Sequence, residues 1–184
     1  MTPSYPWYAD AEGDEIEQGD LFDGCPVYMP TVDAREHGIV DFEWEERDLI
    51  VLSQSCDLVK GREKLTEVLL CSVWNRSELT TGHLSTPKGL EDARRGNLPG
   101  FHVLARCDLT GLAREVRVVD FRRIYSLPLA LLRKRALLDA RRLRLLPPVA
   151  NTCRRRSRGS SCESACPSTS RPSSRHILVR LKGR

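Results

Sequence analysis

Five consecutive residues, Ser53-Gln54-Ser55-Cys56-Asp57, form the densest group of reactive side chains in the chain. The apolar run Leu49–Leu52 precedes them and is typical of a buried strand. We therefore expect hydroxyl, amide, thiol and carboxylate groups to meet where this strand ends, at one edge of a sheet.

Cys56 and Asp57 are the candidate catalytic residues at this position. A nucleophilic cysteine acts as a thiolate and needs a nearby cation or imidazole, for which His83 and His102 are the candidates. The alternative is structural, with Cys56 as a small buried hydrophobe and Asp57 closing the turn through backbone hydrogen bonds. The residue types leave both interpretations open.

The same cysteine could instead belong to a zinc site with Cys71, Cys107 and His83 or His102. The close pairs C-x2-C and H-x3-H, from which such sites are usually built, are absent. The glycine motifs that cradle phosphates are absent too. We therefore predict no metal ligands and no cofactor.

The charge of the chain is unevenly distributed. Residues 149–184 contain nine Lys or Arg and one acid, Glu163, whereas residues 1–148 contain 20 basic and 24 acidic residues. The basic pI of about 8.8 is therefore a property of the C-terminal part. It is weak support for nucleic-acid binding by the body of the protein.

The N-terminal segment indicates the compartment. Met1–Asp20 has neither the basic start nor the apolar run of about seven residues that mark a signal peptide. No segment approaches the roughly 20 apolar residues that cross a membrane. We expect a cytoplasmic protein with reduced thiols and no membrane association.

The hydrophobic pattern favours a β-rich body. Ile39–Glu45 alternates cleanly, and a polar connection at Glu46-Arg47-Asp48 would join it to Leu49–Leu52 as a hairpin. Further strands are expected at Leu21–Tyr28, Glu67–Trp74, Phe101–Ala105 and Glu115–Phe121, with a short helix at Leu90–Arg95. Ser126-Leu127-Pro128 resembles a helix start, and the pattern predicts a helix from Leu129 to Ala140.

These elements predict three regions. Residues 1–18 are acidic and read as a flexible arm, residues 19–146 as the globular domain, and residues 147–184 as a disordered basic tail rich in Ser and Arg. The composition of this tail is also what a G+C-rich gene yields when it is translated out of frame. One alternative frame permits SEHLSQAFARFFMRVGLP, which has the spacing of an amphipathic helix. A basic arm that grips phosphates is the competing interpretation.

Several short strings resemble the PemK/MazF family of small barrels. They are Gly19-Asp20-Leu21, Leu49-Ile50-Val51-Leu52-Ser53, Leu69-Leu70-Cys71-Ser72-Val73 and Val118-Val119-Asp120-Phe121-Arg122-Arg123-Ile124. The resemblance implies an α+β fold, a small, strongly bent, SH3-like antiparallel β-barrel with a C-terminal helix. It also implies a ribosome-independent endoribonuclease that an antitoxin holds. Arg47 would then contact a phosphate or the transition state, and Ser72 or Ser77 would supply the hydroxyl.

The string Leu-Ser-Gln-Ser-Cys-Asp is similar to one in bacterial and phage proteins of no known activity. Three hypotheses therefore stand. The first is a toxin–antitoxin or phage-related protein that associates with RNA or DNA. The second is an active endoribonuclease with an antitoxin-like partner, and the third is a thiol or metal enzyme centred on Cys56. Arg47, Cys56, Asp57, His83 and His102 are the candidate site residues. The sequence does not determine the oligomeric state.

Overall fold

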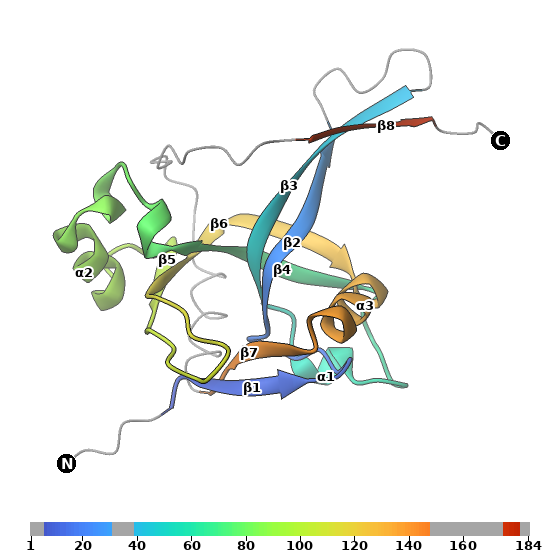
Figure 1. Cartoon of the computed structure of the whole chain (residues 1–184), viewed down its shortest axis with the longest axis horizontal. Helices are drawn as coiled ribbons and strands as arrows, with labels where there is room; N and C mark the ends of the chain where they lie inside the picture. The colour runs from blue at the N-terminus through green and yellow to red at the C-terminus, as the bar shows by residue number, and fades with distance from the viewer. Residues whose placement is uncertain (1–5, 31–38, 148–174, 181–184) are drawn as a thin grey trace.

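The computed structural model describes residues 6–30, 39–147 and 175–180, and these residues form a mostly antiparallel β structure with three helices. The strands are β1 (Tyr8–Glu12), β2 (Leu21–Pro30), β3 (Ile39–Val51), β4 (Glu67–Asn75), β5 (Phe101–Leu104), β6 (Arg117–Pro128), β7 (Arg141–Leu145) and β8 (Arg175–Arg180). The helices are α1 (Ser55–Leu58), α2 (Pro87–Arg95) and α3 (Leu129–Asp139), with 3-10 turns η1 (Arg76–Glu78) and η2 (His83–Ser85) (Figure 1).

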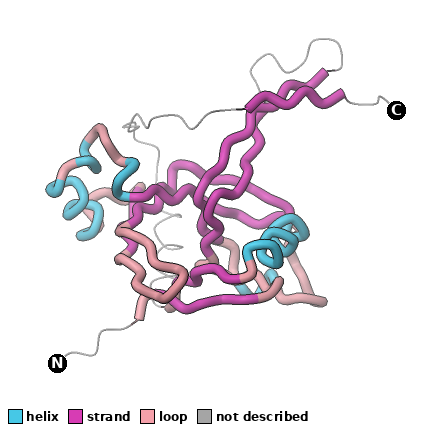
Figure 2. Tube along the Cα trace, viewed as in Figure 1, coloured by secondary structure: helices cyan, strands magenta, loops and turns pink. Residues whose placement is uncertain are grey.

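The strands form two open sheets, so the predicted barrel is wrong for the part of the chain that the structure describes. One sheet has the order β2-β3-β4-β6-β5, with β8 paired to β3, and the other consists of β1 and β7. Figure 2 shows the strands in magenta. A closed barrel needs the end strands β2 and β5 of the large sheet to be joined. In the described residues they form no ladder with each other or with β1 and β7. Instead β1 and β7 pair with each other, Tyr8 opposite Leu145 and Glu12 opposite Arg141.

The predicted hairpin at Glu46-Arg47-Asp48 is also wrong, because β3 continues through these residues without a turn. Their polar groups find partners within the sheet. Arg47 pairs with Glu45, and the Asp48 carboxylate accepts a hydrogen bond of 2.9 Å from the Gly24 amide. That amide lies where the register of β2 on β3 shifts, between Phe22 and Cys25. A charged triplet is thus accommodated inside a long strand.

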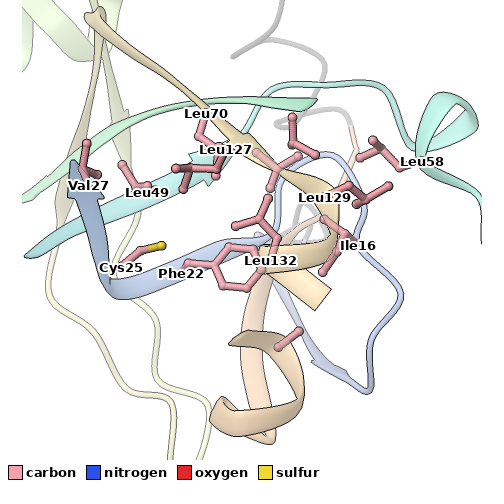
Figure 3. Close-up of a cluster of buried hydrophobic side chains, with 13 residues drawn as sticks. Ile16, Phe22, Cys25, Val27, Leu49, Leu58, Leu70, Leu127, Leu129 and Leu132 are labelled. Carbon is pink, nitrogen blue, oxygen red and sulfur yellow. The ribbon is translucent and has the colours of Figure 1, made fainter. Parts of the chain in front are cut away.

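Alternation along the strands separates the apolar side chains into clusters on the two faces of the large sheet. On one face, Ile50, Val73 and Phe121 pack with Leu143 and Leu145 of the β1–β7 sheet. On the other, Leu49, Leu70, Phe22 and Leu127 pack with Leu129 and Leu132 of α3 (Figure 3). A third cluster, which includes Trp74, Leu84 and Phe101, packs near α2. The helical spacing of Leu129, Leu132, Ala136 and Ala140 predicts a core-facing stripe, and the first three are buried. Ala140 is exposed and follows the end of α3.

The expectation of a flexible arm over residues 1–18 is wrong for Tyr8–Glu12, which are β1, and for Ile16, which is buried. Fully buried Asp20 explains this docking. Its carboxylate pairs with Arg142 at 2.9 Å and also with Arg144, while the Glu17 amide donates to it at 3.0 Å. The chain before Asp20 is thereby tied to β7.

Cations near the C-terminus of a helix suit its dipole, so Arg141, Arg142 and Arg144 after the predicted helix favour a solvated helix end. They belong to β7 instead. In the predicted tail, Arg175–Arg180 form β8 and pair with Ile39–Trp44 of β3, which contradicts disorder at those residues. The remainder of that prediction, over 148–174 and 181–184, lies outside the described residues. Among the described helices, none is long and apolar enough to cross a membrane.

Candidate functional site

The turn after β3 uses both serines of the reactive string for structure. The Ser53 hydroxyl accepts a hydrogen bond of 2.9 Å from the Leu69 amide, and the Ser55 hydroxyl accepts one of 3.1 Å from the Gln18 amide. The two side chains therefore satisfy backbone donors of β4 and of the N-terminal segment. Both serines therefore fix the position of the turn and of α1.

Cys56 is exposed at the start of α1, contrary to the interpretation of it as a buried hydrophobe. Its sulfur lies 3.7 Å from Gln54 Oε1 and 3.7 Å from Asp57 Oδ1, both of which are acceptors. Asp57 in turn pairs with Lys64 at 3.2 Å. These contacts do not form the cationic environment of an activated cysteine.

The two candidate histidines lie elsewhere. His83 is in η2, with its Nε2 3.1 Å from the Asp92 carboxylate of α2, and α1 and α2 lie at opposite ends of the molecule (Figure 1). His102 is in β5 and stacks on Trp7, with 6.4 Å between ring centroids. The structure therefore does not bring Cys56, His83 and His102 together. Within the described residues no three His, Cys, Asp or Glu side chains are grouped as metal ligands.

Arg47 lies in a different environment, against the tryptophan of β4. Its guanidinium carbon is 4.8 Å from the centre of the Trp74 ring, within the range of a cation–π interaction. The Glu45 carboxylate, two residues earlier on the same face of β3, accepts a 2.7 Å hydrogen bond from Arg47 Nε. The Arg47 and Glu45 side chains are only 9% and 8% exposed, so the pair is fixed in position.

Two further arginines come from a large irregularity in β6. Cys71 is opposite Ile124 whereas Ser72 is opposite Asp120, so Phe121, Arg122 and Arg123 have no counterpart on β4. Such bulges redirect side chains and are frequent next to functional sites. Here the bulge brings Arg123 to 5.2 Å from the Trp74 ring centre and Arg122 to 4.2 Å from that of Phe101.

A buried carboxylate organises these two arginines. Asp120, which is 1% exposed, accepts hydrogen bonds from the Arg122 amide at 3.1 Å and from Arg122 Nε at 2.9 Å, and its other oxygen lies 4.0 Å from Arg123 Nε. Ser72 is opposite Asp120 in the register, so the two side chains share the face that carries Trp74. We call Arg47, Trp74, Phe101, Asp120, Arg122 and Arg123 the arginine–aromatic cluster.

Of this cluster, the sequence indicates Arg47 as a site residue, and Arg122 and Arg123 as two of several scattered arginines that could contact phosphate. It gives no sign of Trp74, Phe101 or Asp120. The dipeptide Arg122-Arg123 directly after an alternating strand was a usable signal, because arginine side chains are common donors to phosphate oxygens. The bulge that turns them toward Trp74 and Phe101 has no local signature. Comparisons of the chain with family models, curated proteins and solved structures found no match.

Proposed function

We propose that the protein binds nucleic acid through the arginine–aromatic cluster. The observation that carries the proposal is that Arg47 and Arg123 stack on one indole ring while Arg122 stacks on Phe101. A guanidinium whose plane is fixed by stacking can present its edge to a phosphate and form two parallel hydrogen bonds.

The burial of the cluster indicates the kind of contact. Trp74 and Phe101 are 6% and 9% exposed, so their rings support the arginines more than they offer faces to bases. The Arg122 and Arg123 side chains are 16% and 28% exposed and form the accessible part. We therefore expect binding that depends on phosphates, tolerates different sequences and weakens with salt.

The test measures the affinity of fluorescein-labelled single-stranded RNA by fluorescence anisotropy at several salt concentrations. Arg123→Gln removes one phosphate contact, and we expect an affinity loss of about tenfold and a salt slope smaller by about 0.7. Arg94→Gln on α2 is the matched control, because Arg94 is an exposed arginine paired with Glu91 outside the cluster. Equal losses in the two variants, or no binding by the wild type, would refute the proposal.

A second candidate function is endoribonuclease activity, as the PemK/MazF resemblance implies. The observation in its favour is that Arg47, Ser72 and Asp120 face the same side of the sheet. Expression should then arrest growth, Arg47→Ala should relieve the arrest, and a small acidic antitoxin-like protein should be the partner. Normal growth at full induction would exclude this function.

We also propose that the protein works in the cytoplasm. The four cysteines of the described body, Cys25, Cys56, Cys71 and Cys107, are all free thiols. Proteins of a reducing compartment typically keep their cysteines in this state. Fractionation of the producing cells, with immunodetection of the chain, tests this assignment.

A further inference from the structure

A second basic site lies away from the arginine–aromatic cluster, where α3 turns into β7. It is a cavity of about 430 Å³ between β2, the 109–114 loop, the end of α3 and the start of β7. Four arginines line it, Arg114, Arg135, Arg141 and Arg142, with only two carboxylates, Asp23 and Asp139. Its size is within the range of small-molecule sites. Asp10 and Asp20, which lie outside the lining, pair with Arg141 and Arg142.

The ion pairs at the mouth of this cavity are partly open to solvent. The Arg141 side chain is 45% exposed and its partner Asp10 is 32% exposed, while Arg114 and Asp23 are 36% and 37% exposed. Exposed pairs of this kind contribute little to stability. A ligand anion could therefore replace a carboxylate at these arginines without disrupting the fold.

Behind the mouth, two guanidinium groups share one carboxylate. Asp23 accepts hydrogen bonds from Arg114 Nη2 at 2.6 Å and from Arg117 Nη1 at 3.0 Å. Arg117 is fully buried, and its Nε and Nη2 atoms have no hydrogen-bond partner among the described residues. This buried cation adds positive potential on the side of Asp23 that faces away from solvent.

Two residues that line the cavity next to Arg141 have positive backbone φ angles. Ala140 has φ 58°, and it is the one residue other than glycine with positive φ among those described. Gly111 has φ 79°, and a Cβ there would lie 3.2 Å from Arg141 Nη1. Strain of this kind persists where the surrounding structure demands it, often at binding sites. The absence of a side chain at Gly111 leaves room for the Arg141 guanidinium at the cavity.

We propose that this cavity binds a small anion with at least two phosphate groups, of the size of a nucleoside diphosphate or smaller. The guanidinium groups of Arg114, Arg135 and Arg141 come from the loop, α3 and β7, so they can surround adjacent phosphates from several directions. Arg142 is held instead by Asp20 and by the carbonyls of Gly13 and Glu15. Planar, fixed donors suit phosphate oxygens through paired charge-assisted hydrogen bonds. This site is independent of the proposed nucleic-acid interface.

The test titrates inorganic pyrophosphate into the full chain at low ionic strength and measures heat by calorimetry. We expect saturable one-to-one binding that Arg141→Gln weakens at least tenfold, whereas the charge-matched Arg94→Gln leaves it unchanged. Asp139→Asn removes a lining carboxylate and should tighten binding several-fold, a gain that a misfolded variant cannot produce.

Absence of saturable binding to the wild type, equal weakening in both arginine variants, or unchanged affinity in Asp139→Asn would overturn the proposal. Equal affinity for citrate would overturn the assignment to phosphate. Arg123→Gln in the arginine–aromatic cluster should leave pyrophosphate affinity unchanged. A failure of this site is therefore distinguishable from a failure of RNA binding.

Discussion

The substitution Asp20→Asn tests whether a buried ion cluster ties the N-terminal segment to β7. Asp20 is fully buried, and its carboxylate receives Arg142 Nε at 2.9 Å, Arg144 Nη2 at 3.0 Å and the Glu17 amide at 3.0 Å. The Arg142 side chain is only 2% exposed. Asparagine keeps the shape but removes the charge, which leaves Arg142 with an uncompensated charge in the interior.

Breaking a buried pair in this way costs about 3–5 kcal/mol. Arg142 keeps its hydrogen bonds to the carbonyls of Gly13 and Glu15, so we expect the lower end, about 3 kcal/mol. For a chain of this length that corresponds to a fall in melting temperature of about 6–12 °C. Asp10→Asn is the matched control. Asp10 pairs with Arg141, which lies in β7 next to Arg142, but both side chains of this pair are exposed. We therefore expect a loss of unfolding free energy below about 1 kcal/mol.

Urea denaturation followed by circular dichroism measures the free energy of unfolding of both variants, with the slope checked for two-state behaviour. A loss in Asp20→Asn no larger than that in Asp10→Asn would show that the cluster does not hold the segment. The explanation of why this acidic segment is folded would then fail.

Three further predictions concern the core, a buried acid and the thiols. Leu132→Ala, at a fully buried position of α3, should cost about 2–5 kcal/mol in the same denaturation assay, whereas Leu138→Ala, 81% exposed on that helix, should be nearly neutral. Burial raises the pKa of Asp48 above 3.8, so its ionised form destabilises the folded state at neutral pH. Asp48→Asn should therefore stabilise the protein at pH 7, and the gain should vanish as the pH falls below 3.8; a constant gain would contradict this. Burial also raises the pKa of the Cys25 thiol to about 11, so iodoacetamide at about pH 8 should label exposed Cys56 and spare Cys25 in peptide maps of the native protein.

The strands with a clear local pattern were predictable from the sequence. Glu67–Asn75 and Phe101–Leu104 lie within a residue of the expected ends, and α3 matches because its apolar stripe has helical spacing. The Ser126–Pro128 helix start was wrong, because these residues continue β6 opposite Glu67, Val68 and Leu69 of β4. The residue types of Ser126–Pro128 suit both a helix cap and the end of a strand. Pairing with β4 favours the strand.

The elements that sequence reasoning missed depend on partners far along the chain. Asp20 and Arg142 are 122 positions apart, and each looks like a surface residue until the other is placed beside it. β1 and β7 are therefore charged strands whose burial has no local signal. The arginine–aromatic cluster is similar, because Arg47 reaches Trp74 only when β3 runs straight through a charged triplet.

Photo-crosslinking of RNA that contains 4-thiouridine tests the central claim most directly. The full chain is irradiated with the RNA, digested and analysed by mass spectrometry. If the arginine–aromatic cluster is the interface, crosslinked peptides should come from β6 and the adjoining β4, near Arg122 and Arg123. Crosslinks confined to the basic residues 149–184, or to surfaces away from β6, would contradict the account.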